Sequence, residues 1–258
     1  MSVDFSVKGK VAIVTGGSKG IGRAIALALA EHGADITIAA RGEEALASAK
    51  ADIEAAGRRC LAISANMAKE EDWKRLVDET VAKFGGVDIL VNGAAVASNF
   101  GPVENTDSKR WDLCMKVNLK APWALSSMCL PSMRERGGGS IIHITSNEGM
   151  RPTQGMGAYS VSKGALVTLT QLCGKEWAPH RVRVNCIAPG LVRTEMATPL
   201  IEHFEKQGHL PNPMKRIGEP DDIAGLALYL ASGAGIYTTG QNFVVDGGEL
   251  VLAPTDQL

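Results

Sequence analysis

The sequence has no apolar run that approaches the ~18 residues needed for a membrane-spanning helix. Residues 1–10 also lack the apolar core of a secretory signal peptide. Both absences favour a cytoplasmic protein that neither crosses nor binds a membrane.

Residues that hold metals or form disulfides are few. The 5 cysteines are odd in number and have no CxxC spacing, which predicts reduced, mostly buried thiols rather than a disulfide framework. The 5 histidines are dispersed and match no metal-ligand pattern. We therefore expect no catalytic metal.

Neither sign of charge is in excess. The chain has 27 Lys and Arg against 28 Asp and Glu, for a net charge of −1, and the basic residues are scattered. A nucleic-acid-binding surface would need clustered basic residues. We therefore expect a small molecule, and not a nucleic acid, as the partner.

Apolar strand-like runs alternate with helical stretches along the whole chain. The predicted strands are Lys10–Thr15, Asp35–Ala40, Cys60–Ser64, Val87–Val91, Ser140–Thr145, Arg183–Ala188 and Phe243–Val245. The predicted helices are Gly20–His32, Glu43–Ala56, Glu70–Phe84, Ser108–Arg134, Tyr159–Trp177 and Pro220–Ala231. Continuous apolar strands separated by helices are typical of a parallel sheet with both faces covered. The sequence thus predicts an α/β fold, with one doubly wound Rossmann domain over residues 1–258.

The stretch Leu191–Gly218 interrupts this alternation. It holds three prolines and several apolar residues, among them Met196 and Leu200. A long insertion in a compact domain is often a lid or binding loop, so we predict a lid over the substrate. A surface helix pair that only packs is the alternative.

A glycine-rich loop, Thr15–Gly22, follows the first predicted strand and opens the first predicted helix. Gly16, Gly20 and Gly22 are spaced so that the backbone can turn tightly and approach a pyrophosphate, next to the positive N-terminus of the helix. One gap is longer than in the common GxGxxG pattern. No Lys-Ser/Thr pair follows the last glycine, which argues against a nucleotide hydrolase.

The choice of cofactor depends on the end of the second strand. This strand ends Ala39-Ala40-Arg41, without the carboxylate that would bind a ribose 2′-hydroxyl. Arg41 could instead bind a 2′-phosphate, and Lys19 could add a second cation. The sequence therefore predicts NADP(H) rather than NAD(H); two solvated loop cations are the alternative.

Tyr159 and Lys163 would lie four residues apart on one face of a helix. A neighbouring ammonium favours the phenolate, and so would lower the tyrosine pKa from its usual value near about 10. Such a pair could move a proton to or from an alcohol or carbonyl oxygen near neutral pH.

Together, the glycine loop and Tyr159-x-x-x-Lys163 resemble the short-chain dehydrogenase/reductase family, from Lys10 to Gly248. Other positions agree in the same order: Asn92–Ala95, Asn118, Ser146, Pro189–Gly190, Thr194 and Asp246–Gly248.

The resemblance implies four catalytic residues. Tyr159 would be the acid in reduction and the base in oxidation, and Lys163 would lower its pKa and hold the nicotinamide ribose. Ser146 would polarise the substrate oxygen. Asn118 would kink its helix and help hold a water-linked proton path behind Lys163. The implied cofactor site consists of Gly16, Ser18, Lys19, Gly20, Ile21, Gly22, Arg41, Asn66, Met67, Asn92, Tyr159, Lys163, Pro189, Gly190, Val192 and Thr194.

The chain departs from the family pattern near the cofactor. Gly93 replaces the usual second Asn, and Ala95 replaces the usual Gly. Asn66 stands where an Asp commonly follows the third strand; it could bind adenine through its amide, while Met67 would offer its backbone. These departures affect cofactor affinity rather than the type of reaction.

The function implied by the resemblance is NADP(H)-dependent reduction of a ketone or aldehyde to an alcohol. Reductases of 3-oxoacyl thioesters, and sugar and hydroxysteroid dehydrogenases, share these motifs. An NADP(H)-sensing binding protein would have lost catalytic residues, and a cofactor-free lyase or dehalogenase would have lost the glycine loop. The residues expected near the substrate are Val96, Ala97, Ser98, Glu148, Met150, Arg151, Met156 and Leu191.

Assembly is also implied by the resemblance. Relatives commonly form homotetramers through the helices Ser108–Arg134 and Tyr159–Trp177 and through the last helix, the last strand and the tail Glu249–Leu258. We expect a homotetramer or a homodimer.

Overall fold

The structure is a computed structural model that describes residues 3–97 and 100–251. Within these residues, seven strands form one parallel sheet in the order β3-β2-β1-β4-β5-β6-β7. The strands are β1 Val11–Thr15, β2 Asp35–Ala40, β3 Cys60–Ser64, β4 Ile89–Asn92, β5 Gly139–Ile144, β6 Val182–Pro189 and β7 Asn242–Val245. The strand order reverses between β1 and β4, as in a doubly wound sheet. The predicted fold class is therefore confirmed.

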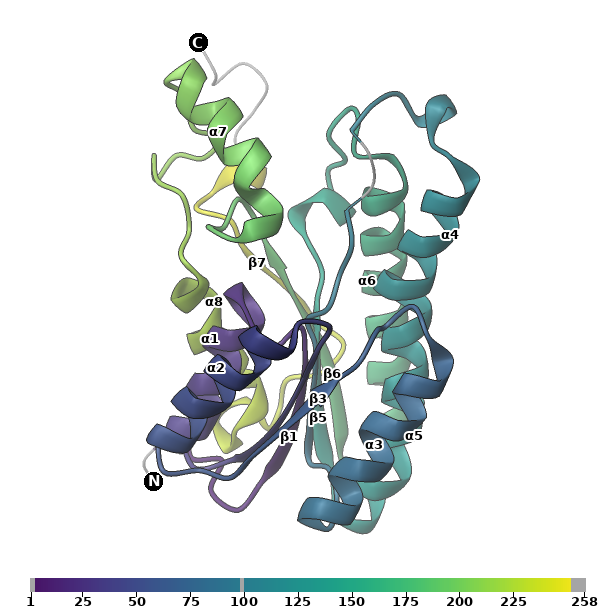
Figure 1. Cartoon of the computed structure of the whole chain (residues 1–258), viewed down its shortest axis with the longest axis vertical. Coiled ribbons are helices and arrows are strands. Elements are labelled where there is room, and N and C mark those ends of the chain that lie inside the picture. The colour runs from purple at the N-terminus through teal and green to yellow at the C-terminus, as the bar shows by residue number, and fades with distance from the viewer. Residues whose placement is uncertain (1–2, 98–99, 252–258) are drawn as a thin grey trace.

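Helices cover both faces of this sheet (Figure 1). They are α1 Gly20–Glu31, α2 Glu43–Ala55, α3 Glu70–Phe84, α4 Ser108–Met115, α5 Ala121–Glu135, α6 Gly157–Trp177, α7 Thr198–Gln207 and α8 Pro220–Ala231. Apolar residues of α1, α2 and α8 pack in one core cluster, and those of α3, α5 and α6 pack in another on the opposite face. The strands are buried on both sides, which explains why they are apolar throughout instead of alternating.

The predicted helix Ser108–Arg134 is present without a gap as far as Glu135, and it is irregular around Asn118, where a kink was expected. A π-helical turn, Lys116–Lys120, separates α4 from α5. Pro122 is the second residue after this turn and has no N–H to donate to the carbonyl of Asn118, so the regular helical bonding cannot continue there. The wider turn carries Asn118 on the inner side of the helix, where it is 1% exposed.

The other predicted elements are confirmed, with ends that differ by at most two residues. The stretch Leu191–Gly218 contains α7, which apolar periodicity could have indicated. Among residues 3–97 and 100–251, every helix is too short or too polar to cross a bilayer. Ser98 and the tail beyond Val251 lie outside the described residues.

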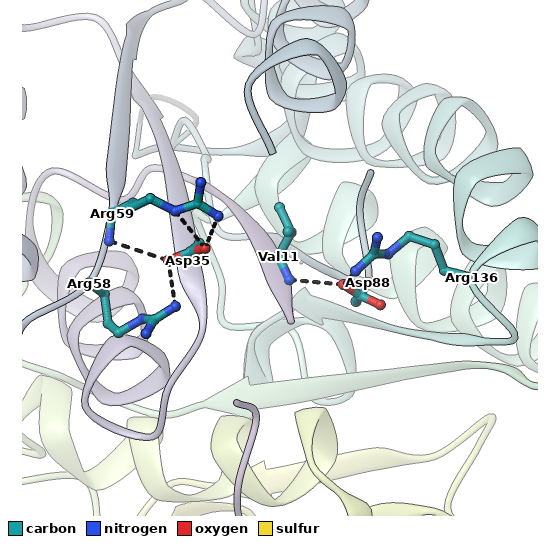
Figure 2. Close-up of polar contacts among 6 residues, drawn as sticks. All are labelled: Val11, Asp35, Arg58, Arg59, Asp88 and Arg136. Atoms are coloured by element: carbon teal, nitrogen blue, oxygen red, sulfur yellow. Dashed lines mark hydrogen bonds and ion pairs between the residues drawn. The ribbon is translucent and has the colours of Figure 1, made fainter. Parts of the chain in front are cut away.

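Two buried aspartates bind the amino ends of the strands together, at the edge opposite the glycine loop (Figure 2). Asp88 accepts from the Val11 N–H at 2.9 Å, from Arg136 at 2.7 Å and from Lys10 at 3.3 Å. Asp35 accepts from both Arg58 and Arg59. Burial opposes ionisation of Asp35, but these two guanidinium groups outweigh it and lower its pKa.

Replacing Asp88 by alanine is expected to lower the free energy of unfolding by about 3 kcal/mol. The change removes the buried acceptor of the Val11 N–H, Lys10 and Arg136. Leaving these donors without a partner should lower the free energy of unfolding by more than the loss of one hydrogen bond. Urea titration of both proteins measures the difference. Asp52→Ala is the control, because Asp52 is 43% exposed, pairs only at the surface with Arg23, and should cost about 0–1 kcal/mol. Equal losses in the two variants would contradict the expectation.

Candidate active site

The predicted site residues come together at the carboxyl edge of the sheet. The glycine loop follows β1, Arg41 follows β2, Asn92 ends β4, Ser146 follows β5, and Pro189 ends β6. In doubly wound folds ligands bind at this edge, close to the point where the strand order reverses. The fold therefore places the predicted site residues where such a ligand binds.

The glycine loop is built so that side chains are excluded. Gly16 has φ +72°, a conformation that favours glycine, and a Cβ on Gly22 would lie 2.3 Å from the Gly16 carbonyl oxygen. A Cβ on Gly20, at φ +51°, would lie 3.0 Å from Cγ2 of Thr194. Ser18 is buried and Ile21 half-buried in the same loop. This bare backbone at the start of α1 fits the pyrophosphate of a dinucleotide.

Thr15 joins the glycine loop to the end of β4. Its Oγ1 accepts from the N–H of Gly93 at 3.1 Å and of Ala94 at 3.2 Å. A Cβ on Gly93 would lie 2.8 Å from the Thr15 carbonyl oxygen. The departure at Gly93 therefore coincides with a close approach of two backbone segments, and sequence reasoning missed Thr15.

Tyr159 and Lys163 lie one turn apart in α6. The Lys163 Nζ is 5.6 Å from the centroid of the Tyr159 ring and donates to the Ile144 carbonyl at 2.7 Å. Lys163 is only 3% exposed. The two side chains therefore meet beside the end of β5, as the spacing predicts.

The prediction that the Tyr159 pKa lies below its usual value is wrong for this structure. Burial raises the pKa of Tyr159 to about 12, and the neighbouring Ser146 side chain offsets this rise only in part. Burial also lowers the pKa of Lys163 to about 8. The physical reason is that desolvation disfavours both charges, while the ammonium gives its hydrogen bond to Ile144.

Ser146 stands between Tyr159 and the start of the following loop. Its side chain lies near enough to Tyr159 to lower the phenol pKa, and its Oγ accepts from the Glu148 N–H at 3.2 Å. The Ser146 hydroxyl also donates to Oδ1 of Asn147 at 3.3 Å. A hydroxyl and a phenol thus lie side by side, where both can reach one substrate oxygen.

Asn118 connects the π turn to its surroundings. Its Oδ1 accepts from the Val96 N–H at 2.9 Å, and its Nδ2 donates to the Val96 carbonyl at 2.9 Å and to Ser162 at 3.0 Å. The amide therefore fixes the backbone beyond β4 against α6. The role of Asn118 in a water-linked proton path stays a prediction.

Asn92 points away from the site edge. Its Nδ2 donates to Nδ1 of His143 at 3.1 Å and lies 3.4 Å from Oγ of Ser126, and Asn92 is 2% exposed. Burial lowers the pKa of His143 to about 3, which keeps this imidazole neutral. Asn92 could therefore meet a cofactor only through its backbone.

The two cations predicted to select NADP differ in their surroundings. Arg41 is exposed at the end of β2, and its carbonyl accepts from Ser64. Lys19 forms an ion pair of 2.8 Å with Glu195, a residue at the start of the predicted lid. Arg41 is thus exposed to solvent, whereas Lys19 already has an acidic partner.

Asn66 closes its own turn by accepting from the Ala68 N–H at 3.0 Å.

The Met67 backbone, which was predicted to bind the cofactor, already makes one hydrogen bond within its own loop. Its carbonyl accepts from Nε1 of Trp73 at 3.0 Å, and its side chain is buried.

The predicted lid is fastened at its base. Val192 and Gly218 form a parallel bridge, in which Arg193 N donates to the Gly218 carbonyl at 2.8 Å and Gly218 N to Leu191 at 2.9 Å. Pro189 and Gly190 lead into this base, and Thr194 caps the turn Glu195–Ala197. Leu191–Gly218 therefore leaves and rejoins the domain at one point, as a lid would.

Glu148 does not point freely into the substrate region. Its carboxylate accepts from the N–H and Oγ1 of Thr153 and from Oγ of Ser160. These bonds hold the loop between Ser146 and Tyr159, which supports a structural role for Glu148.

Two further residues lie next to Ser146 that sequence reasoning did not single out. Burial raises the pKa of the Glu249 carboxyl group to about 7, and the nearby Asn147 side chain lowers it in part. A Cβ on Gly190 would lie 3.2 Å from Oε2 of Glu249, so this carboxyl group reaches the end of β6. The position of Glu249 directly after Asp246-Gly247-Gly248 was the available signal.

The described parts of the chain contain no group of three or more His, Cys, Asp or Glu placed to hold a metal ion. The doubly wound sheet, the glycine loop and the Ser146–Tyr159–Lys163 group define a dinucleotide-binding protein of the Rossmann class.

Comparison with known proteins shows which family of this class the chain resembles. A family model described as enoyl-(acyl carrier protein) reductase matches residues 16–249. Human dehydrogenase/reductase SDR family member 4 is 38% identical over 241 residues, which cover 93% of this chain and 87% of the human protein.

Two solved structures extend the comparison. L-sorbose reductase from Gluconobacter frateurii, complexed with NADPH and L-sorbose, is 33% identical with a TM-score of 0.91, covering 97% of this chain and 100% of that chain. Carveol dehydrogenase from Mycobacterium avium, in complex with NAD, is 27% identical with a TM-score of 0.91, covering 95% and 99%. The chain belongs to the short-chain dehydrogenase/reductase family, a family of oxidoreductases.

Proposed function

We propose that this protein is an NADP(H)-dependent reductase that converts a ketone or aldehyde to an alcohol, with Tyr159 as the proton donor. The observation that carries the proposal is the group of Ser146, Tyr159 and Lys163 at the end of β5, at the same sheet edge as the glycine loop. A bound NADPH would supply the hydride that reaches the carbonyl carbon.

The division of labour follows from the charge that develops on the substrate. When the carbonyl carbon gains a hydride, its oxygen becomes an alkoxide that needs donors placed in advance. The Ser146 hydroxyl and the Tyr159 phenol are two such donors, and Tyr159 gives its proton to the oxygen. Lys163 would hold the nicotinamide ribose, and Asn118 keeps the backbone around Val96 in place.

The state of Tyr159 favours reduction. A phenol whose pKa is raised to about 12 stays protonated at neutral pH, as a proton donor must. Alcohol oxidation needs the phenolate, and its population grows as pH rises toward the pKa. We therefore expect kcat/KM for alcohol oxidation to rise about tenfold per pH unit above neutrality. Initial rates with NADP and a secondary alcohol at several pH values measure this; a flat profile would contradict the assignment of Tyr159 as the base.

The cofactor assignment rests on Arg41 and Lys19, together with the absence of a carboxylate at the end of β2. The two related structures described above bind NADPH and NAD, so the family accommodates both cofactors. Binding constants for NADPH and NADH, measured by fluorescence, test the choice directly.

The substrate class is tested by following NADPH absorbance with a panel of carbonyl compounds. The panel contains a simple ketone, a dicarbonyl, a keto sugar such as L-sorbose, a ketosteroid and a 3-oxoacyl thioester. L-sorbose reductase and carveol dehydrogenase act on very different molecules, so relatives do not narrow the choice. If NADPH binds and no compound is reduced, the protein is a cofactor-sensing binding protein.

We further propose that the protein forms a homotetramer, or a homodimer, in the cytoplasm. Apolar residues of α5 and α6 are exposed, including Trp123 at 49% and Leu172 at 52%. A surface of this kind is unusual for a monomer. Analytical ultracentrifugation gives the mass in solution, and a monomer would refute the proposal. The cytoplasmic location rests on the five free thiols.

A further inference from the structure

The start of the predicted lid is fixed against the glycine loop. A Cβ on Gly20 would lie 3.0 Å from Cγ2 of Thr194, so the two segments are in contact. Thr194 also caps the turn Glu195–Ala197, because its Oγ1 accepts from the Ala197 N–H at 3.3 Å. Glu195 therefore lies in a capped turn directly beside the glycine loop.

Glu195 reaches across this contact to Lys19. Its Oε2 accepts from the Lys19 Nζ at 2.8 Å, and the Lys19 and Glu195 side chains are 62% and 78% exposed. An ion pair that is this exposed to water is weak. The Lys19–Glu195 pair can therefore open when a stronger anion reaches Lys19.

The glycine loop is joined to the strand end that carries Arg41. Thr15 pairs with Ala39 in the sheet, and the Gly16 N–H donates to the Ala39 carbonyl at 2.8 Å. Arg41 follows two residues after Ala39 and is exposed. A 2′-phosphate held by Arg41 would thus bind beside the loop that carries Lys19, whose ammonium is paired with a lid carboxylate.

We propose that Glu195 is a specificity-determining residue, which competes with the 2′-phosphate of NADP(H) for the Lys19 ammonium and so limits the preference for NADP(H) over NAD(H). The proposal rests on the proposed function, because it assumes that the 2′-phosphate contacts Lys19. It gives the lid a part in the choice of cofactor.

The competition follows from the charges. A 2′-phosphate carries about two negative charges near neutral pH, against one on the Glu195 carboxylate, so the phosphate is the stronger partner for an ammonium. Binding of NADP(H) through Lys19 must break the ion pair with Glu195, and the free energy of that pair is subtracted from the binding. NAD(H) has no 2′-phosphate and leaves the pair intact.

The test is nucleotide binding to Glu195→Gln, a change that keeps the size of the side chain and removes its charge. Calorimetry gives the dissociation constants of adenosine 2′,5′-bisphosphate and adenosine 5′-monophosphate, which differ only in the 2′-phosphate and need no turnover. The bisphosphate should bind about two- to fivefold more tightly to the variant than to the wild type, which matches the strength of an exposed ion pair. The affinity for the monophosphate should not change.

The matched control is Glu205→Gln, which removes another exposed carboxylate of the lid, in α7. It should change neither constant, because Glu205 lies outside the capped turn that holds Glu195. NADPH and NADH should follow the bisphosphate and the monophosphate, respectively, in every variant.

A double variant shows whether Glu195 acts through Lys19. In a Lys19→Ala background, Glu195→Gln should no longer tighten binding of the bisphosphate, because no ammonium is left to release. An undiminished gain in this background, equal tightening of both probes, or no tightening in Glu195→Gln would each overturn the proposal. Failure of the proposed function is a different result, namely NADPH binding without reduction of any carbonyl compound, and it leaves these binding constants as they are.

Discussion

Replacing Tyr159 by phenylalanine is expected to lower kcat/KM for carbonyl reduction by about 10²–10⁴-fold, the usual contribution of a general acid. In the proposed mechanism the phenol gives its proton to the substrate oxygen. Ser146 can polarise that oxygen, but a serine hydroxyl is far too weak an acid to replace the phenol. Phenylalanine preserves the ring that lies beside Lys163, so the loss should come from the missing proton.

Two measurements show whether this variant loses activity because the proton donor is missing or because the folded structure is damaged. NADPH binding, followed by fluorescence, should change little, because the glycine loop and Arg41 are untouched. Tyr237→Phe is the matched control, since Tyr237 is fully exposed and the same hydroxyl is removed without effect on the site. If Tyr159→Phe keeps more than about a tenth of the wild-type rate, another group supplies the proton.

The sheet could be predicted from the sequence because its signals are local. Each central strand is a short apolar run bounded by a turn, and parallel pairing brings the residues after β1, β4, β5 and β6 to one edge. The family motifs then assigned roles to residues such as Ser146 and Tyr159 that their local sequence alone would not reveal. Apolar periodicity does not reveal the π turn at Lys116–Lys120, because π and α turns carry similar apolar patterns, whereas the family pattern indicated a kink at Asn118.

Side-chain pairing across the fold could not be predicted. Lys19 and Glu195 are 176 residues apart, and only the path of the lid brings them together. Asn92 fits the motif, yet its amide bonds inward to His143, because two polar side chains on paired strands share one buried face. The Tyr159 pKa was predicted in the wrong direction, since a motif gives the neighbour but not the degree of burial, which dominates here.

Replacing Arg41 by aspartate is expected to weaken NADPH binding by about 10–150-fold. One charged hydrogen bond contributes about 1.5–3 kcal/mol, and each 1.4 kcal/mol is a factor of ten in affinity. The new carboxylate would also repel a 2′-phosphate, whereas it could accept hydrogen bonds from the 2′-hydroxyl of NADH. The ratio of the two dissociation constants should therefore move toward NADH by more than the loss for NADPH alone.

The comparison with Lys19 makes this experiment more selective. The Lys19 ammonium already pairs with Glu195, so a 2′-phosphate must compete with a carboxylate for it, and Lys19→Ala should weaken NADPH binding less than Arg41→Asp. Arg134→Asp, a change of an exposed arginine at the far end of α5, controls for the altered net charge. Both constants are obtained by titrating the nucleotides into the protein. Equal weakening of NADPH and NADH by Arg41→Asp would show that Arg41 binds a part common to both, and the preference for NADP would then have to come from other residues.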